Sequence, residues 1–317
     1  MMKYLLSVLL AIMIATPAMA AEELGVYVKS VEKVGGTFDE TVKAVEGGLS
    51  GAGFTVLASY ESGVDERCGQ RAHVVVVNQD GYAEKIMAKG PTAAFALPLR
   101  VGIYENSSGI NIAFVNPSSI NRTVLGDDVE TELSESTASA IDDAITSSVK
   151  GNAVCAQIGQ LRKKGYVGGM GGGEFLKKLV TFHEGGEYAD VLAEAKKGIE
   201  SNEKDWKLVY SMEPSEGVTL MGLTKPATEA KAFDIAGDSR ESKTEPCPGL
   251  DHAAAFPIEV VVYREDGKTM MVSMDEMYRM KVYFEDAGNW AFMKNMTMPG
   301  NIQDELEDVV TSGIKEK

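Results

Sequence analysis

The sequence predicts an α+β fold made of two tandem two-layer sandwich domains, in which helices cover one face of a mainly antiparallel sheet. Three observations lead to this fold class: sequence blocks recur in the same order, strand and helix patterns alternate within each set, and a glycine-rich stretch separates the two sets. Strands mixed with helices and joined by short turns are typical of this architecture. We expect the two domains to be related by a pseudo-twofold axis, as an intramolecular pseudo-dimer.

The first twenty residues, MMKYLLSVLLAIMIATPAMA, have the pattern of a secretory signal peptide. Lys3 precedes an apolar run over residues 5–15, and Ala-Met-Ala at residues 18–20 is a small-x-small cleavage pattern. The run is shorter than the roughly 20 apolar residues that span a bilayer. Ala21 stands where a lipoprotein has Cys. We therefore expect cleavage near Ala20 and a periplasmic or secreted protein.

The first recurring block is a Gly-Gly turn followed by an amphipathic helix. EKVGGTFDETVKAVEGGL at residues 32–49 aligns without a gap with FHEGGEYADVLAEAKKGI at residues 182–199. The positions that form one apolar helical stripe coincide: Phe38, Val42, Val45 and Leu49 in the first copy, and Tyr188, Leu192, Ala195 and Ile199 in the second. We interpret Gly35-Gly36 and Gly185-Gly186 as tight strand-to-helix turns rather than as phosphate cradles.

Two further blocks recur in the same order. PLRVGIYENSSGINIAFV from Pro98 corresponds to PIEVVVYREDGKTMMVS from Pro257, and both have the alternation and the Gly-containing turn of a β-hairpin. IDDAITSSV from Ile141 corresponds to LEDVVTSGI from Leu306, an acidic amphipathic helix that closes each copy. Three blocks in one order indicate a duplicated domain.

Each copy is expected to contain strand, helix, strand, strand, helix, strand, strand and helix. In domain 1, residues 25–150, these elements cover residues 25–31, 37–49, 54–60, 72–78, 81–88, 98–104, 110–115 and 136–149. Residues 151–173 are expected to form a Gly-rich linker. Domain 2 covers residues 174–317 and carries an insertion at residues 234–252, which is expected to be an exposed loop.

The charge balance limits the partners. The chain has 31 basic and 47 acidic residues, a net charge of −16. Such a surface repels phosphate backbones and anionic lipid heads, and no later apolar run is long enough to span a membrane. We expect no nucleic-acid partner and no membrane contact after signal cleavage, which leaves a small molecule or a protein.

The first copy resembles the domain of unknown function called DUF302, and the second resembles it more faintly. The resemblance rests on TFDETVKAVEGGLSGAGFTVLASY at residues 37–60, LPLRVGIYE at 97–105 and FVNP at 114–117. It implies a small α/β domain that tends to pair with a copy of itself, and it implies no agreed activity. Leu99 and Ile258 stand where the family often has Cys, and Asn116-Pro117 is replaced in the second copy by Met274-Asp275-Glu276. Domain 2 is therefore expected to be a degenerate copy.

No catalytic motif is complete. GYVGGMGGGEFLKK satisfies neither nucleotide-binding glycine pattern, and Ala52 breaks a GxSxG pattern around Ser50. His73, His183 and His252 have no metal-type spacing partner. The sequence therefore favours a non-enzymatic protein, while an enzyme with an unrecognised site stays an alternative.

Methionine is concentrated in the second half. Eight residues of this type fall within 29 positions: Met270, Met271, Met274, Met277, Met280, Met293, Met296 and Met298. Thioether sulfur suits Cu(I), so Met293, Met296 and Met298, joined by Cys247 and His252, are a candidate copper site. The alternative is that these side chains fill irregular gaps in the core.

Three cysteines, Cys68, Cys155 and Cys247, allow three different single disulfides. We favour Cys68–Cys247, because both residues lie in loop-like segments and Cys155 lies close to the junction of the copies. No CxxC motif occurs, so a thioredoxin-type activity lacks support.

The sequence as a whole predicts an exported small-ligand-binding or interaction module that acts at the groove between the two copies. Copper handling by the Met-rich second domain is the alternative.

Overall fold

The computed structural model describes residues 23–167 and 175–314. The predicted signal peptide lies outside the described residues, as do residues 168–173 of the predicted linker. None of the described helices combines the length and the apolar character needed to cross a membrane.

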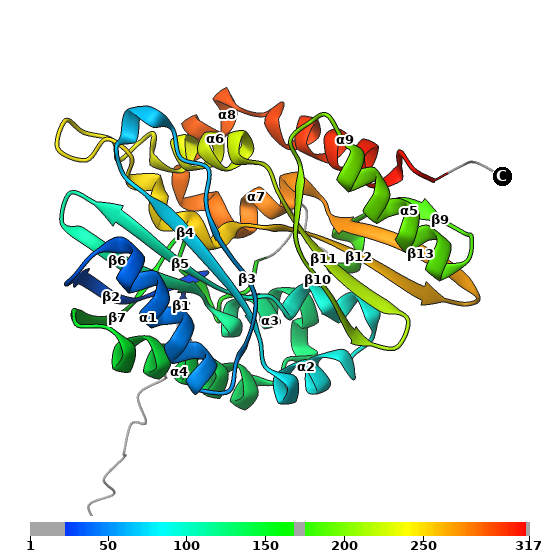
Figure 1. The fold of residues 1–317 in the computed structure, drawn as a ribbon, viewed down its shortest axis with the longest axis horizontal. Coiled ribbons are helices and arrows are strands. Elements are labelled where there is room, and N and C mark those ends of the chain that lie inside the picture. The colour runs from blue at the N-terminus through cyan, green and yellow to red at the C-terminus, as the bar shows by residue number, and fades with distance from the viewer. Residues whose placement is uncertain (1–22, 168–174, 315–317) are drawn as a thin grey trace, which may run out of the picture.

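The first half of the chain forms a six-stranded sheet whose neighbouring strands are antiparallel, with the order β3-β4-β5-β6-β2-β7 (Figure 1). Its strands are β2 (Tyr27–Val34), β3 (Thr55–Glu61), β4 (Ala72–Asn78), β5 (Leu99–Asn106), β6 (Gly109–Val115) and β7 (Asn152–Ile158). Its helices are α1 (Phe38–Gly51), α2 (Asp80–Met87), α3 (Pro117–Leu125) and α4 (Thr131–Ser148), with 3₁₀ turns η1 (Glu66–Cys68), η2 (Pro91–Ala96) and η3 (Gly126–Asp128).

The second half forms a five-stranded antiparallel sheet with the order β10-β11-β12-β13-β9. Its strands are β9 (Leu179–Glu184), β10 (Lys207–Ser215), β11 (Val218–Thr224), β12 (Ile258–Glu265) and β13 (Lys268–Met274). Its helices are α5 (Tyr188–Ser201), α6 (Pro226–Gly237), α7 (Glu276–Phe284), α8 (Asn289–Lys294) and α9 (Met298–Thr311), with 3₁₀ turns η4 (Phe175–Lys178), η5 (Pro248–Ala255) and η6 (Glu285–Ala287). A short pair, β1 (Glu23–Leu24) and β8 (Arg162–Lys163), completes the described strands. The mixed α+β class is confirmed.

Local chemistry explains how the recurring turn and helix form. Thr37 caps α1 by accepting a hydrogen bond from the Glu40 N–H, and the Glu40 carboxylate accepts one from the Thr37 N–H, which is a capping box. Gly36 has a φ of 98° and Gly186 a φ of 75°, so both turns need the left-handed region that glycine enters at little cost. Glu187, in the place of Thr37, makes no capping bond through its side chain.

Strand β7 lies within the segment that was predicted to be a Gly-rich linker. Residues 152–158 pair with β2 instead of forming a flexible connection, so the prediction is wrong for this segment. The strand lies at the edge of the sheet with nearly all of its residues exposed, and it therefore lacks the apolar alternation by which strands are recognised in sequence.

Helix α3 was not expected, and the insertion in the second half is only partly a loop. Asn116 caps α3 and Pro117 occupies its first turn, which is a helix-start signal that we interpreted as the end of a strand. Residues 234–237 finish α6, and η5 buries Leu250 and His252. The prediction of an exposed loop is wrong at both ends of the insertion.

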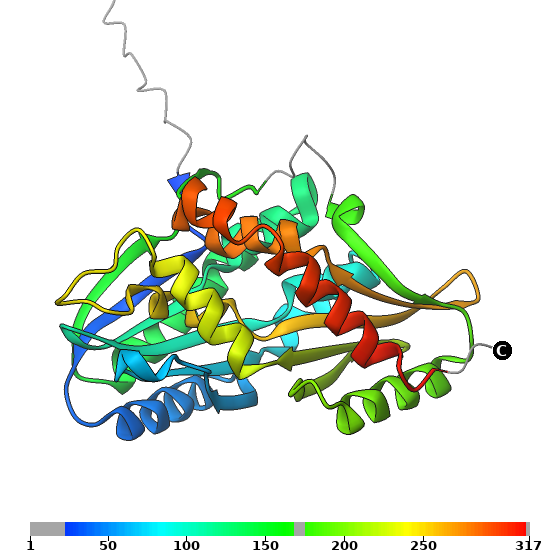
Figure 2. The same cartoon turned by 90° about the horizontal axis from the view of Figure 1, so that it is seen from above.

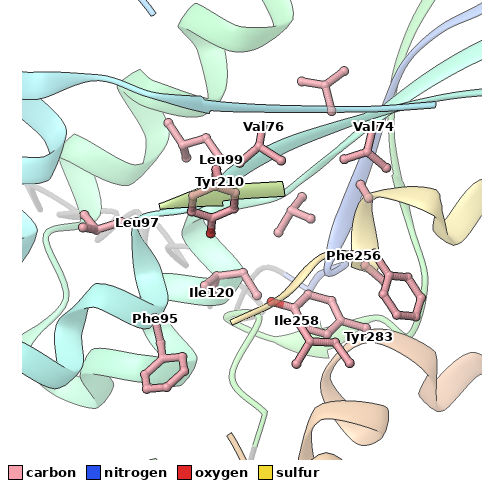
Figure 3. Close-up of a cluster of buried hydrophobic side chains, with 14 of the residues drawn as sticks. Val74, Val76, Phe95, Leu97, Leu99, Ile120, Tyr210, Phe256, Ile258 and Tyr283 are labelled. Carbon is pink, nitrogen blue, oxygen red and sulfur yellow. The ribbon is translucent and has the colours of Figure 1, made fainter. Parts of the chain in front are cut away.

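The two halves share one continuous hydrophobic core. Figure 3 shows Val74, Val76 and Leu99 of the first half gathered with Tyr210, Phe256, Ile258 and Tyr283 of the second. Gly102 in β5 permits the close approach, because a Cβ there would lie 3.0 Å from the Ala254 backbone nitrogen in η5. Figure 2 shows α1 and α5 on one side of the molecule and α7 and α8 on the opposite side.

Candidate functional site

Helix α7 lies between a surface pocket and a buried cluster of charged side chains. With 3.6 residues per turn, Glu276, Arg279 and Tyr283 fall on one face, and all three are buried. Met277, Met280 and Phe284 fall on another face and line the pocket. A single helix therefore shapes both environments.

The pocket has a volume of about 270 Å³, close to the lower end of the range of roughly 300–1,000 Å³ typical of small-ligand sites. Its apolar lining comes from α7 and α8: Met277, Tyr278, Met280, Phe284 and Phe292. Three lysines also line it, Lys177 and Lys178 from η4 and Lys281 from α7. Aromatic and aliphatic walls with a few cationic groups suit a molecule that is apolar over most of its surface and negative at one end.

The two acidic residues of the pocket already have partners. The Asp275 carboxylate accepts a hydrogen bond from the Tyr278 N–H at 2.8 Å and caps α7. The Glu285 carboxylate accepts a hydrogen bond from Arg162 Nε at 2.9 Å. The lining has three lysines and two carboxylates, and one of the carboxylates is paired with Arg162, so positive charge is in slight excess there although the chain as a whole has a net charge of −16.

On the inner side of α7, a buried ion pair joins the two halves. Arg100 on β5 donates to Glu259 on β12 over 2.6 Å, and the two side chains are 1% and 5% exposed. Arg100 also donates to the Pro257 carbonyl oxygen at 3.2 Å and to the Tyr283 hydroxyl. Burial raises the pKa of Glu259, while the Arg100 and Arg279 charges act in the opposite direction.

Arg279 and Glu276 extend this cluster along α7. Arg279 donates to the Ala255 carbonyl oxygen and its guanidinium lies 5.0 Å from the Phe256 ring centroid. Burial raises the pKa of Glu276 to about 7, although the nearby Arg279 lowers it. In the part of the chain that the structure describes, Glu276 Oε1 and Arg279 Nε have no hydrogen-bond partner.

Glu276 and Arg279 do not face the surface pocket. They line a separate cavity of about 20 Å³, and Met280 and Phe284 line both spaces. A cavity of this size holds about one water molecule. The cavity beside the Glu276 carboxyl group is therefore too small for a substrate. The raised pKa of Glu276 does not by itself support an enzyme active site at this position.

A second buried carboxylate, Glu229 on α6, links the halves at another point. Its oxygens accept hydrogen bonds from the Thr224 hydroxyl at 2.5 Å and from the Gly63 N–H at 2.6 Å. Burial raises its pKa to about 7, although these hydrogen bonds lower it. Both oxygens are engaged, so Glu229 acts as a structural tie from the second half to the first.

His252 is held between two carboxylates and is not an available metal ligand. Nδ1 lies 2.6 Å from Asp251 and Nε2 lies 2.9 Å from Asp286, while the ring stacks on Phe284 at 5.5 Å. Burial lowers the pKa of His252, but the charges and hydrogen bonds of Asp251 and Asp286 outweigh it and raise the pKa to about 9. The imidazolium is enclosed, with 2% of the side chain exposed.

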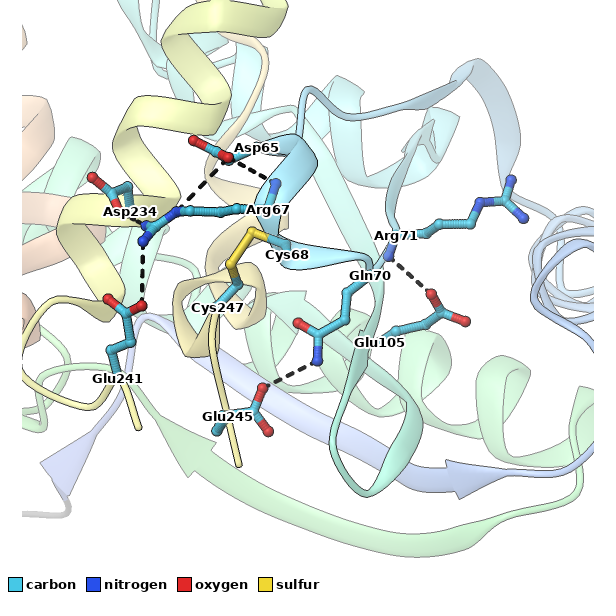
Figure 4. Close-up of a disulfide and its surroundings, with 10 residues drawn as sticks. All are labelled: Asp65, Arg67, Cys68, Gln70, Arg71, Glu105, Asp234, Glu241, Glu245 and Cys247. Carbon is cyan, nitrogen blue, oxygen red and sulfur yellow. Dashed lines mark hydrogen bonds and ion pairs between the residues drawn. A yellow bond between two sulfur atoms is a disulfide. The ribbon is translucent and has the colours of Figure 1, made fainter. Parts of the chain in front are cut away.

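Cys247 forms a disulfide with Cys68, the pairing that we favoured from the sequence, and the two Cα atoms are 5.6 Å apart (Figure 4). The bond ties η1 of the first half to the insertion of the second. Arg67 beside it forms ion pairs with Asp234 and Glu241. Cys155 is exposed and not disulfide-bonded.

The candidate copper ligands do not form one site. Cys247 has no thiol to offer while it is disulfide-bonded, and both ring nitrogens of His252 are occupied, so these two assignments are wrong. Met293 and Met296 are exposed, whereas Met298 is partly buried and packs on the core. Within residues 23–167 and 175–314, no group of three or more His, Cys, Asp or Glu side chains is arranged to hold a metal ion.

The Arg100–Glu259 pair and the shared core lie between the two halves, where a groove was expected. An open hollow of about 530 Å³ remains between α2 and β10, with Asp80, Glu84 and Glu213 among its walls. Its acidic character differs from that of the α7 pocket. All the residues that line the α7 pocket belong to the second half. The sequence analysis expected a site between the two domains and did not predict this pocket.

Sequence reasoning missed the buried charged residues, although a signal was present. Arg100 and Glu259 interrupt two otherwise apolar strands, PLRVGIY and PIEVVVY, at matching positions of the recurring hairpin. A charged residue in such a strand is either paired or functional. No comparable signal marks Glu276 or Arg279, because they belong to a helix that the sequence analysis did not predict.

Residues 29–148 match the family model described as "Domain of unknown function DUF302", which confirms the resemblance for the first half. Among solved structures, the chain is similar to the uncharacterized conserved protein DUF302 from Bacillus stearothermophilus, with 16% identity and a TM-score of 0.32. That match covers 38% of this chain and 95% of the other. No curated protein matches this chain. The α7 pocket lies outside residues 29–148, so the family match says nothing about it.

Proposed function

We propose that this chain is an exported, non-enzymatic binding protein whose α7 pocket takes a small molecule with an anionic group on an apolar body. The observation that carries the proposal is the combination of an apolar, aromatic wall with three lysines in a strongly acidic protein. Electrostatic complementarity with the lysines would orient the anionic end, and burial of the apolar part would supply affinity.

The two-domain organisation is part of the proposal. We propose that the halves are tandem copies of a DUF302-like domain related by a pseudo-twofold axis. Support comes from their common strand order and from the contact of Arg100 with Glu259, which stand at matching positions of the recurring hairpin. In a twofold interface, equivalent positions near the axis meet each other. Removal of residues 1–20 on export, and a periplasmic location, are parts of the same proposal.

Copper handling is a weaker candidate. Its support is reduced to Met293 and Met296, which are exposed near the end of α8. Two thioethers without a thiolate or imidazole partner make a weak Cu(I) site. We do not propose it as the main function.

A thermal-shift and native mass spectrometry series tests the binding proposal. Octanoate, octanol and octylamine share an apolar body and differ in charge. We expect octanoate alone to raise the melting temperature, by about 5 °C when its concentration is 100 times its Kd, since that excess adds about 2.7 kcal/mol. Equal shifts with octanol would show that the lysines do not select the ligand.

Two variants locate the site. Met280→Trp should fill the pocket and abolish the octanoate shift, and Lys281→Met should weaken it about tenfold. Lys197→Met changes an exposed lysine of α5 and is the matched control, because α5 lies on the opposite side of the molecule from α7 (Figure 2). A shift that survives Met280→Trp would place binding elsewhere and refute the proposal.

A further inference from the structure

The open hollow of about 530 Å³ between α2 and β10 is built by both halves of the chain. Helix α2 of the first half contacts β10 of the second, and the walls come from residues 78–88 and 212–215. The hollow shares no lining residue with the α7 pocket. The two sites can therefore be tested independently of each other.

Three carboxylates and no basic side chain are among the residues that line the hollow. Asp80 and Glu84 lie one turn apart on α2, and Glu213 comes from β10. All three residues are exposed. Like charges four residues apart destabilise a helix, and Glu213 adds a third negative charge from the other half. A cation in the hollow would reduce this repulsion.

The hydrogen bonds made by two of these carboxylates come from uncharged donors. Asp80 accepts one from the Asn78 side-chain nitrogen at 3.2 Å, and Glu213 accepts one from the Gly217 N–H at 3.3 Å. These donors leave the negative charge of both carboxylates uncompensated.

Basic residues of the surrounding segments do not line the hollow. Lys85 belongs to α2 but is not part of the wall, and Lys89 forms ion pairs with two carboxylates outside the hollow. Lys207 lies at the opposite end of β10 from the wall residues. The guanidinium of Arg264, on β12, lies 5.0 Å from the Tyr188 ring centroid. The hollow is therefore open to a cation from solution.

Asn78 contributes an unpaired acceptor to the same hollow. It lines the hollow and is 7% exposed, and within the described part of the chain its Oδ1 has no hydrogen-bond partner. The amide nitrogen of Asn78 is already bonded to Asp80, so the acceptor half of the amide is the half that lacks a partner. Buried acceptors in proteins are normally hydrogen-bonded. An N–H donor that enters the hollow would satisfy this oxygen.

The spacing of the acceptors indicates a cation larger than a metal ion. Among residues 23–167 and 175–314, no three His, Cys, Asp or Glu side chains are close enough together to hold one metal ion. A flexible chain with several ammonium groups can instead place one charge near each carboxylate and donate an N–H to Asn78. Met87 and Met212 supply apolar wall for the methylene groups between the charges. We propose that the hollow between the halves binds a linear polyamine.

Isothermal titration calorimetry of the full chain tests the proposal. A net charge of −16 attracts every cation, so the titrations are made at about 0.15 M salt, where charges more than about 8 Å apart are largely screened. We expect saturable binding of spermidine at one site. Affinity should fall from spermidine to 1,4-diaminobutane to butylamine, by up to about fivefold for each ammonium group lost. Mg²⁺ should bind less tightly than 1,4-diaminobutane, because it cannot reach separated carboxylates.

Variants at exposed positions locate the site without disturbing the core. Glu84→Gln/Glu213→Gln should weaken spermidine binding on the order of tenfold, because two ion pairs are lost. Ala88→Lys places a cation in the wall of the hollow and should weaken binding in the same direction. Glu200→Gln/Asp304→Asn is the matched control, since it removes two exposed carboxylates that do not line the hollow and changes the net charge equally. The control should bind spermidine like the unchanged protein.

Several results would overturn the proposal. Equal affinities for spermidine, butylamine and Mg²⁺, or an equal loss in the control variant, would show general attraction to an acidic surface and no specific site. Binding that does not saturate would lead to the same conclusion. Met280→Trp, which fills the α7 pocket, should leave spermidine binding unchanged. Loss of spermidine binding in that variant would place the polyamine in the α7 pocket and also overturn the proposal.

Discussion

Removal of Arg100 tests whether the buried ion pair joins the two halves as the structure indicates. In Arg100→Met, the Glu259 carboxylate would stay buried without its cationic partner, and the Pro257 carbonyl and Tyr283 hydroxyl would lose a donor. Breaking a buried pair by removing one partner costs about 3–5 kcal/mol. We expect a loss of about 4 kcal/mol in the free energy of unfolding near pH 8.

The loss should depend on pH in a defined direction. Burial already raises the pKa of Glu259 and Arg100 opposes it, so the folded-state pKa rises further without Arg100. A folded-state pKa above the unfolded value means that the folded protein binds the proton more tightly. The variant should therefore be least stable above that pKa and regain stability as the pH falls toward 5.

Urea denaturation of a double-mutant cycle at pH 8 and pH 5 measures both effects. Arg100→Met/Glu259→Met should recover most of the loss, because apolar replacements of a buried pair are often neutral or stabilising. Arg122→Met is the control, since its partner Asp127 is fully exposed and a surface pair contributes about 1 kcal/mol or less. A loss below about 1 kcal/mol in Arg100→Met, or a double variant as unstable as the sum of the two single variants, would refute the reasoning.

Two further predictions concern His252 and the disulfide. The pKa of His252 is raised to about 9, so the stabilisation from its charge is complete below about pH 6.5 and is lost as the pH rises through 9. Between pH 6 and pH 10, the free energy of unfolding measured by urea denaturation should fall by at most about 3 kcal/mol, and this fall should be absent in His252→Gln. The same fall in both proteins would show that other groups cause it. Reduction of Cys68–Cys247, which are separated by 179 residues, should lower the free energy of unfolding by at most about 5 kcal/mol. Cys68→Ser/Cys247→Ser should be insensitive to reductant, and peptide mapping that found Cys155 in the disulfide would contradict the pairing.

The fold class was predictable because local patterns repeat in this chain. The apolar stripes of α1 and α5 and the hairpins β5–β6 and β12–β13 fall in the segments that the recurring blocks marked. Strand β7 was missed because its stability comes from pairing with β2 and not from an apolar face of its own. Helix α3 was missed because its capping Asn116 and the following Pro117 also fit the end of a strand.

The α7 pocket was beyond sequence reasoning for a different reason. Met277 and Met280 belong to the methionine-rich part of the sequence, but a thioether can bind copper, pack in a core or line a ligand pocket. Their role depends on which side of α7 faces the interior, and on that side Arg279 donates to the Ala255 carbonyl oxygen and Glu276 lines a small internal cavity. Lys177 and Lys178 reach the pocket from η4, outside α7 and α8.

The pair of Arg100 and Glu259 has a consequence for how the two halves recognise each other. On the proposed duplication, these residues are equivalent, and a contact between two identical halves would oppose two arginines or two carboxylates in a buried site. Like charges buried together cost several kcal/mol, whereas the tandem chain places opposite charges 2.6 Å apart. Divergence at one matched position therefore makes each half complementary to the other and not to itself. Because the disulfide and Glu229 also cross between the halves, the whole chain is the unit whose binding should be measured.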